Sequence, residues 1–246
     1  MLVSLFGLFH HVAWMFKAFY WQTFVAVRFF QIRFLGYKHV KLLKTPKRVV
    51  VSTNSGCIGK TANIVSWLVD ARVKDISIYD RSGALSKLSL SFAVSLKTRL
   101  DERLIFGNCI ENIGEIVVFT NGCRVPAARI SLHDGGDSYT VRILDPSDSD
   151  MDIVRVVKDL SNDDSVEPAC VTEEVLNEKF SCSNGTTNPV DLILAYTGAP
   201  NLNGLPPWLL RNAEILLMDQ VVENSTYAFF VWALFTYSKT EQRWGA

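Results

Sequence analysis

The sequence predicts an α/β protein with a mostly parallel central sheet flanked by helices. Three observations support this fold class. Residues 48–53 (RVVVST) form an apolar run without alternation, which is typical of a strand buried on both faces of a parallel sheet. Strand-like and helix-like segments then alternate along the chain. The length of 246 residues suffices for one sizeable core and an appendage.

The first half of the globular region begins with the strand at residues 48–53 and a short loop. A helix follows, with Ile64, Trp67, Leu68 and Ala71 at helical spacing. A second strand is expected at residues 75–80 (DISIYD). The next helix runs toward residue 100, and its apolar positions Leu85, Leu88 and Phe92 are expected to face the core.

The second half continues the alternation. Strands are expected at residues 115–120, 129–133 and 139–144, and the last two are joined by an Asp-Gly-Gly-Asp turn. Ser149 or Asp150 can cap a helix at residues 151–160. Residues 161–189 are polar and irregular, with one short helix near 171–180. Apolar runs at 191–195 and 215–218 then precede a helix at about 226–239.

The amino-terminal segment differs in composition from the rest of the chain. Residues 1–69 carry nine Lys or Arg and no Asp or Glu, so the remaining 16 basic and 25 acidic residues give the body a net charge of −9. Residues 1–36 are strongly apolar, and their apolar segment reaches the length of a membrane-spanning helix only if it includes Lys17. A buried helix of the globular domain is disfavoured, because Lys17, Arg28 and Arg33 would need partners in a core.

These features predict a membrane anchor at residues 1–36, a basic linker at 37–47 that lies against anionic lipid headgroups, and a globular domain at 48–246. A single spanning helix and an embedded interfacial helix both fit the anchor. All the positive charge follows the apolar segment, which predicts a cytosolic body. No recognised nucleic-acid-binding motif accompanies the linker.

The five cysteines are odd in number and form no Cys-x-x-Cys pair, which favours reduced thiols over a disulfide framework or a zinc site. One motif points to a nucleotide-binding enzyme. Gly59-Lys60-Thr61 lies between a strand and a helix, as in a phosphate-binding P-loop, although Asn54 stands where that loop needs Gly. Residues 215–219 (ILLMD) resemble the apolar run and following Asp that hold magnesium in P-loop enzymes.

Several motifs carry a resemblance to a known family. They are Tyr-Asp-x-x-Gly at 79–83, Asp-Leu-Ile-Leu at 191–194, Leu-Pro-Pro-Trp at 205–208, Ala-Glu-Ile at 213–215 and Glu-Gln-Arg-Trp-Gly at 241–245. Together they resemble the cis-prenyltransferases, and most closely their non-catalytic partner subunit of the Nogo-B receptor type. The resemblance covers most of residues 48–246 and is weak in the middle. It implies the undecaprenyl diphosphate synthase-like fold.

The catalytic pattern of that family is incomplete in this chain. Catalytic members resemble Asp-Gly-Asn-Gly-Arg-Trp in the first loop after a strand, whereas no Asp or Arg lies between Thr53 and Asp70 here. They also carry an Arg-x-Ser after the Asp-Leu-Leu strand, and residues 195–198 (AYTG) contain no Arg. The groups with which catalytic members bind diphosphate in these two loops are therefore missing. The chain alone should not make polyprenyl diphosphate, and its status as an enzyme stays open.

The resemblance assigns the functional residues to the tail. It implies that Arg243 hydrogen-bonds isopentenyl diphosphate in a partner's active site and that Gly245 contributes a backbone N–H. Trp244 would pack the tail in place. Glu214 matches a family carboxylate linked to magnesium, and a structural role for it is preferred. The helix at 226–239 is apolar all round, which favours a sheet on one side and a partner on the other.

The resulting expectation is a membrane-anchored accessory subunit of a dehydrodolichyl diphosphate synthase complex at the endoplasmic reticulum. Its catalytic partner would bind Mg²⁺ and condense isopentenyl diphosphate onto farnesyl diphosphate, for dolichol synthesis and protein glycosylation. The other partners expected are membrane lipid and isoprenoid diphosphates. Two alternatives stay open: a P-loop enzyme that uses Gly59-Lys60-Thr61, and a membrane receptor or scaffold without an enzymatic role.

Overall fold

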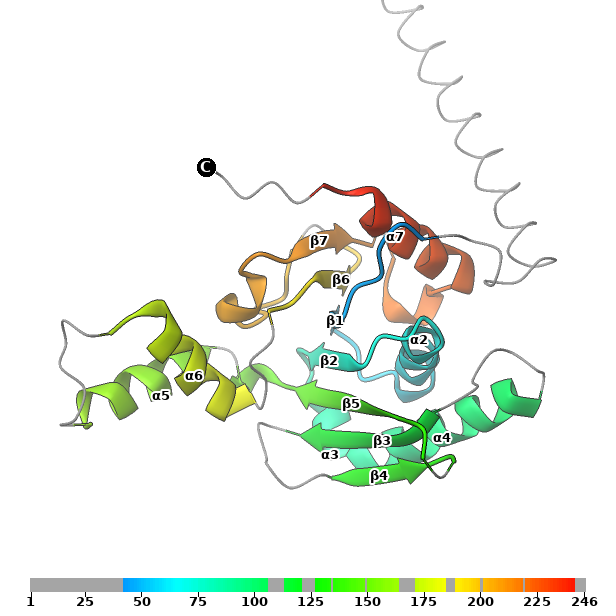
Figure 1. Cartoon of the computed structure of the whole chain (residues 1–246), viewed down its shortest axis with the longest axis horizontal. Helices are drawn as coiled ribbons and strands as arrows, with labels where there is room; N and C mark the ends of the chain where they lie inside the picture. Colours follow the sequence, from blue (N-terminus) through cyan, green and yellow to red (C-terminus); the bar gives the residue numbers. More distant parts are fainter. Residues whose placement is uncertain are drawn as a thin grey trace, which may run out of the picture. The chain divides into compact units, whose positions relative to one another are not determined.

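A seven-stranded sheet in the order β4-β3-β5-β2-β1-β6-β7 forms the centre of the protein (Figure 1). The computed structural model describes residues 42–105, 113–120, 127–133, 135–148, 150–163, 171–184, 189–199, 201–218 and 220–241. These residues belong almost entirely to one compact unit, Lys44–Ala246. The predicted anchor at 1–36, most of the predicted linker and the tail at 242–246 lie outside the described residues, so the domain boundaries stay predictions.

All neighbouring strands are parallel except β4, which runs antiparallel to β3. The strands are β1 (Arg48–Thr53), β2 (Asp75–Asp80), β3 (Ile113–Thr120), β4 (Ala128–Ser131), β5 (Asp137–Leu144), β6 (Leu192–Tyr196) and β7 (Glu214–Leu217). Every residue of β1 and β6 is buried, as expected for central strands of a parallel sheet covered on both faces.

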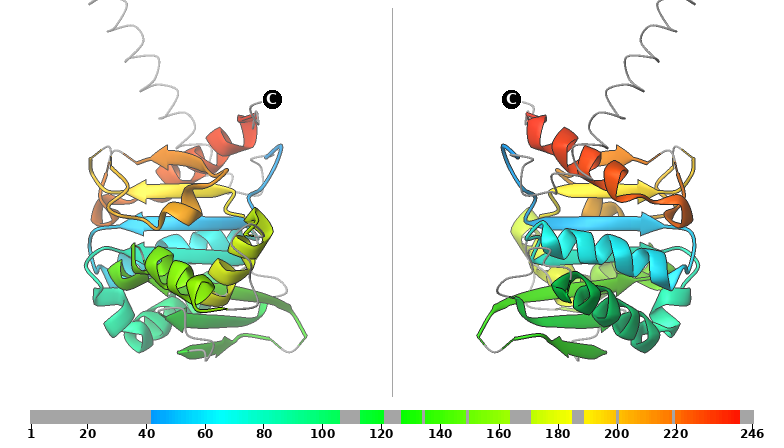
Figure 2. Two further views of the ribbon diagram at one scale, coloured as in Figure 1. Left: turned by 90° about the vertical axis from the view of Figure 1, so that its left-hand side faces the viewer. Right: turned by 90° about the vertical axis from the view of Figure 1, so that its right-hand side faces the viewer.

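Helices α2 (Ile58–Asp70), α4 (Ser89–Ile105) and α7 (Tyr227–Lys239) cover one face of the sheet, as the right-hand view of Figure 2 shows. The side chains that they bury against it are aliphatic and aromatic: Ile64, Leu68, Phe92, Leu96, Leu100, Phe230 and Leu234. Trp67 of α2 joins two of these helices, because its ring lies 5.6 Å from the rings of both Tyr227 and Phe230. This layer forms the larger core.

The opposite face carries α5 (Asp150–Ser161) and α6 (Glu173–Asn184), seen in the left-hand view of Figure 2. A second apolar cluster lies on this side, where the segment around the 3-10 helix η4 (Pro207–Leu210) packs on the sheet. Its buried members are Val50, Tyr79, Leu144, Val190, Ile193, Leu205 and Leu209. Phe180 of α6 stacks on Trp208 at a centroid distance of 4.4 Å and so links α6 to this segment.

The α/β fold with a mostly parallel sheet is confirmed, and the helix predicted toward residue 100 needs a correction. It is two helices, because α3 (Ala84–Lys87) ends before Leu88 and α4 begins after it. The interruption changes the helical phase, so Leu88 is 47% exposed instead of facing the core. Asp150 is the first residue of α5, and Ser149 lies outside the described residues. Within the described ranges, no helix has the length and hydropathy needed to cross a bilayer.

Candidate functional site

The loops that follow β1, β2, β5 and β6 meet at the carboxyl edge of the sheet. Ligands of open α/β sheets bind at this edge. The amide of Asn54, after β1, donates to the carbonyl of Thr197, after β6, at 3.5 Å. A side-chain carbon on Gly83, after β2, would touch Asp145 and Pro146, after β5. The loop after β1, which the resemblance matches to the diphosphate-binding first loop of catalytic members, therefore lies at this carboxyl edge.

The loop between β1 and α2 packs closely against the start of α3. The backbone N–H of Ser55 donates to the hydroxyl of Thr53 at 3.1 Å, which folds the loop back on the end of β1. A Cβ atom added to Gly56 would lie well inside contact distance of the Cβ of Ala84. Glycine is therefore required at position 56 by close packing.

The geometry does not fit a P-loop. Asn54 is not among the non-glycine residues with positive φ, so it does not supply the left-handed turn that the missing glycine would give. The Thr61 hydroxyl is fully buried and donates to the carbonyl of Cys57 at 2.8 Å, where it cannot hold a metal ion. Strand β7 is separated from β1 by β6, and Asp219 lies outside the described residues.

The carboxylates at this edge are engaged by their own loops. Asp80 is fully buried and accepts the N–H of Leu85 at 2.9 Å and the hydroxyl of Ser82 at 2.7 Å, so it caps the start of α3. Asp145 accepts the N–H of Ser147 at 2.9 Å. Across the described ranges, no three His, Cys, Asp or Glu side chains gather in a way that could hold a metal ion. The edge does not fit a magnesium–diphosphate site.

The end of β6 offers no cation for a diphosphate either. Tyr196 is fully buried, and burial raises the pKa of its hydroxyl well above the ordinary value. The Thr197 hydroxyl donates to the carbonyl of Ala199 at 2.5 Å. The first Lys or Arg after β6 is Arg211, which pairs with Glu173 of α6. Residues 54–57 after β1 and 197–199 after β6 therefore supply neither the carboxylate nor the guanidinium that the catalytic pattern uses for diphosphate.

Glu214 lies at the opposite, amino edge of the sheet. It is the first residue of β7, opposite Leu192 at the start of β6, and its N–H donates to the carbonyl of Asp191 at 3.0 Å. The pKa of Tyr237 in α7 is raised by burial first and then by the negative charges of Asp191 and Glu214. This position away from the carboxyl-edge loops favours the structural interpretation of Glu214.

The tail residues Arg243, Trp244 and Gly245 lie outside the described residues, but the point where the chain reaches them is described. Helix α7 ends at Lys239, on the amino edge of the sheet. There the ammonium of Lys44 donates to the carbonyl of Thr240 at 2.6 Å and lies 4.5 Å from the ring centre of Tyr237. The basic composition of residues 37–47 predicts a linker against lipid headgroups, and it could not reveal that Lys44 contacts the end of α7.

Among the residues that the structure describes, none covers an apolar surface at the β7 edge of the sheet and on α7. Strand β7 has a single neighbour, and its side chains Ile215 and Leu217 are 37% and 43% exposed. Phe230, Val231, Leu234 and Tyr237 of α7 are buried, so one side of this apolar helix packs on the protein's own core. On its other side Phe229 is 42% exposed. An unpaired edge strand with exposed aliphatic side chains is a surface that proteins normally cover.

No family model matches the chain. Two solved structures share its fold: lavandulyl diphosphate synthase from Lavandula x intermedia in complex with dimethylallyl diphosphate, with a TM-score of 0.57 and 15% identity, and a probable undecaprenyl diphosphate synthase from Campylobacter jejuni, with a TM-score of 0.51 and 16% identity. Each comparison covers 81% of this chain and 98% of the other. The protein thus has the cis-prenyltransferase fold.

Sequence comparison narrows the relationship. The chain is 24% identical over 212 residues to the dehydrodolichyl diphosphate synthase complex subunit nus1 of Schizosaccharomyces pombe, covering 83% of this chain and 79% of the relative. It is 28% identical over 187 residues to the subunit NUS1 of Homo sapiens, covering 75% of this chain and 60% of the relative. The chain is therefore similar to subunits of the dehydrodolichyl diphosphate synthase complex, as the motifs predicted.

Proposed function

We propose that this protein is an accessory subunit of a dehydrodolichyl diphosphate synthase complex, and that its catalytic partner makes the cis-polyprenyl diphosphate. Two observations on the same chain support the proposal: its similarity to subunits of such a complex and its missing diphosphate-binding residues. Sequence similarity to subunits of that complex extends over three quarters or more of the chain, yet residues 54–57 and 197–199 lack the carboxylate and the guanidinium with which catalytic members bind diphosphate. The chain contributes to the reaction by what it supplies to the partner.

The first contribution is the tail. Arg243 hydrogen-bonds isopentenyl diphosphate in the partner's active site, and Gly245 supplies a backbone N–H at close approach. The place where the tail leaves the domain supports a role for Arg243 in the partner's active site. Thr240 is held at the amino edge, and the three residues to Arg243 span at most about 11 Å of backbone. Strand β1 alone separates the two edges by about 17 Å, so another chain's site is the more accessible target.

The second contribution is a surface that binds the catalytic subunit. Ile215 and Leu217 on the β7 edge and Phe229 on α7 form an exposed apolar surface, which we name the β7–α7 surface. Pairing of a partner's element with β7 satisfies its free backbone groups and covers these side chains. The relatives are named as subunits of a complex, which supports a partner at such a surface.

The membrane and metal assignments belong to the same proposal. Residues 1–36 anchor the complex at the endoplasmic reticulum membrane with the globular domain in the cytosol, and the product serves dolichol synthesis and protein glycosylation. Mg²⁺ binds in the catalytic partner. The composition of residues 1–69, with nine cations and no carboxylate, supports the anchor and its orientation.

Co-expression of the full chain with a catalytic cis-prenyltransferase subunit, followed by a product assay with labelled isopentenyl diphosphate, tests the proposal. The chain alone should be inactive, and the pair active. Arg243→Ala should lower turnover by roughly a hundredfold, because one grip on a diphosphate is lost, while the subunits still co-purify. Arg129→Ala, an exposed arginine on β4, is the matched control and should change nothing.

The same assay separates the alternatives. Unchanged turnover of Arg243→Ala would refute the role of the tail in trans. A receptor or scaffold without enzymatic role predicts no consequence from deletion of residues 243–246. A P-loop enzyme predicts nucleotide affinity of the chain alone that is lost in Lys60→Ala, measured by thermal shift.

A further inference from the structure

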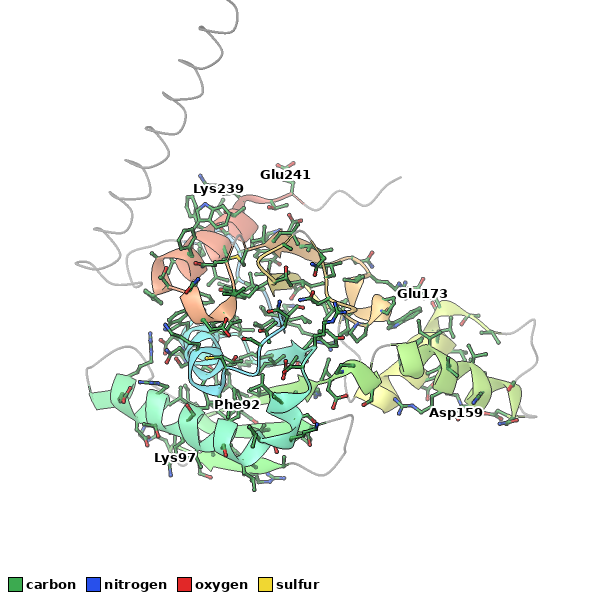
Figure 3. All side chains as sticks on the ribbon, turned by 180° about the vertical axis from the view of Figure 1, so that it is seen from behind. Phe92, Lys97, Asp159, Glu173, Lys239 and Glu241 are labelled. Carbon is green, nitrogen blue, oxygen red and sulfur yellow. The ribbon has the colours of Figure 1, made fainter. Side chains whose placement is uncertain are left out.

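Helices α3 and α4 present aliphatic side chains to solvent on the side that faces away from the sheet. Leu90 and Val94 are 65% and 68% exposed, one helical turn apart, and Leu88 between the two helices is 47% exposed. In Figure 3, Phe92 of α4 points toward the body of the protein while Lys97 points away from it. This outer surface of residues 81–98, which we name the α3–α4 face, is not explained by the proposed function.

The α3–α4 face is also basic. Arg81, Lys87 and Lys97 are exposed, and no Asp or Glu occurs from residue 81 to residue 100. Among the residues that the structure describes, none of these three cations forms an ion pair. The next charges along the chain are Arg99, Asp101, Glu102 and Arg103. Arg99 pairs with Glu102 at 2.9 Å and Arg103 pairs with Asp70, while Asp101 follows Lys97 by one turn of α4. Cations without partners beside exposed aliphatic groups match an anionic apolar boundary.

Helix α5 also exposes aliphatic residues, but it differs from the α3–α4 face in its charge. Ile153, Val154 and Val157 of α5 are exposed in a similar way. That helix, however, carries three aspartates and two cations in its sequence DMDIVRVVKDLS. Its charge is therefore unsuited to an anionic surface, and it offers a matched internal control.

We propose that the α3–α4 face rests on the surface of an anionic lipid bilayer. Leu88, Leu90 and Val94 enter the headgroup region, and Arg81, Lys87 and Lys97 lie among the lipid phosphates. A protein partner is a poorer fit, because aromatic side chains supply much of the affinity of protein-binding surfaces, and Phe92, the aromatic residue of positions 81–98, is buried. The proposal rests on the anchor in the proposed function, which holds the body near the bilayer, so that a weak contact suffices.

Photo-crosslinking with the full chain tests this contact. Benzoylphenylalanine replaces Val94, or Val157 of α5 as control, and the protein is reconstituted in phosphatidylcholine vesicles with or without phosphatidylserine. Both positions are exposed, at 68% and 57%, so both variants should fold. A lipid adduct is expected at position 94 in vesicles with phosphatidylserine, and little at position 157. The double substitution Lys87→Glu and Lys97→Glu should lower the yield of lipid adduct at position 94. Each lysine that is removed should lower it by at least about fivefold.

Three results would overturn the inference: equal lipid adducts at positions 94 and 157, an adduct at 94 that does not depend on phosphatidylserine or on the two lysines, or an adduct to protein instead of lipid. Flotation of the vesicles with the same samples reports on the anchor separately. Protein that floats without an adduct at 94 contradicts the α3–α4 contact alone, whereas protein that fails to float contradicts the anchor. The product assay with the catalytic subunit tests the proposed function independently of both.

Discussion

The ammonium of Lys44 and the carbonyl oxygen of Thr240 are 2.6 Å apart, so the first residue of the folded unit is tied to the residue that follows α7. The same ammonium lies over the ring of Tyr237 at 4.5 Å. The contact joins residues 196 positions apart, at the point where the predicted linker enters the domain and the predicted functional tail leaves it. Loss of this contact should therefore affect both stability and the tail.

Replacing Lys44 by Met should lower the free energy of unfolding by about 1–2 kcal/mol, since a hydrogen bond from a charged group and a cation–π contact are lost. Urea denaturation of the full chain in detergent measures this. Lys47→Met is the control, because the Lys47 side chain is exposed and only its backbone N–H is used, toward Asp191 at 2.7 Å. Equal effects of the two substitutions would show that the Lys44 contact contributes nothing.

The two glycines of the P-loop-like stretch should respond in opposite ways to alanine. Gly56→Ala should destabilise the fold by roughly 1–3 kcal/mol, because its Cβ would collide with that of Ala84. Gly59→Ala should be neutral or stabilising, because Gly59 lies in α2 with open space around it. Thermal unfolding of both variants measures the difference. A P-loop would instead make Gly59 the residue that tolerates no side chain, with loss of nucleotide affinity in its alanine variant.

Asp70 should make stability depend on pH. Burial raises the pKa of this carboxyl to about 6, and the guanidinium of Arg103 offsets only part of the rise. A group whose pKa is higher in the folded protein than its ordinary 3.8 favours folding when protonated. Its contribution is therefore greatest in acid, declines as pH rises between about 4 and 6, and stays constant above that window. The total change is up to about 3 kcal/mol.

Comparison of the wild type with Asp70→Asn isolates this contribution, because all other titrating groups are common to both. Chemical denaturation from pH 4 to pH 7 should show the wild type losing stability relative to the variant as pH rises. A difference that does not vary with pH would mean that the Asp70 carboxyl titrates normally in the folded protein.

The central strands could be predicted from the sequence because burial on both faces leaves a continuous apolar run. Strands β1 and β2 have the bounds expected for residues 48–53 and 75–80. The bounds of the edge strand β4 differ more, because it ends at Ser131, two residues before the expected end. The exposed backbone and mixed burial of edge strands weaken the pattern that defines their ends.

The break between α3 and α4 could not be predicted from hydrophobic spacing. The turn after β2 fixes the start of α3, because Gly83 has φ of +65° and the buried Asp80 carboxylate accepts the N–H of Leu85. The break itself lies at Leu88, whose φ of −108° and ψ of 28° depart from helical values. Such tertiary and capping contacts override periodicity. The same limit applies to the candidate site. The absence of Asp and Arg from the family's loops was visible in the sequence, whereas the engagement of Asp80 and Thr61 by their own loops needed coordinates.

The β7–α7 surface should be sensitive to charge. Leu217→Glu places a carboxylate in the apolar surface that we assign to the catalytic partner, so co-purification of the two subunits should fall by tenfold or more, since burying an unpaired charge costs several kcal/mol. Because Leu217 is 43% exposed, the isolated chain should keep its thermal stability. Val157→Glu, on the similarly exposed α5, should leave co-purification unchanged. If Leu217→Glu assembled normally, the partner would have to bind elsewhere, and β7 would need another means of protecting its free edge.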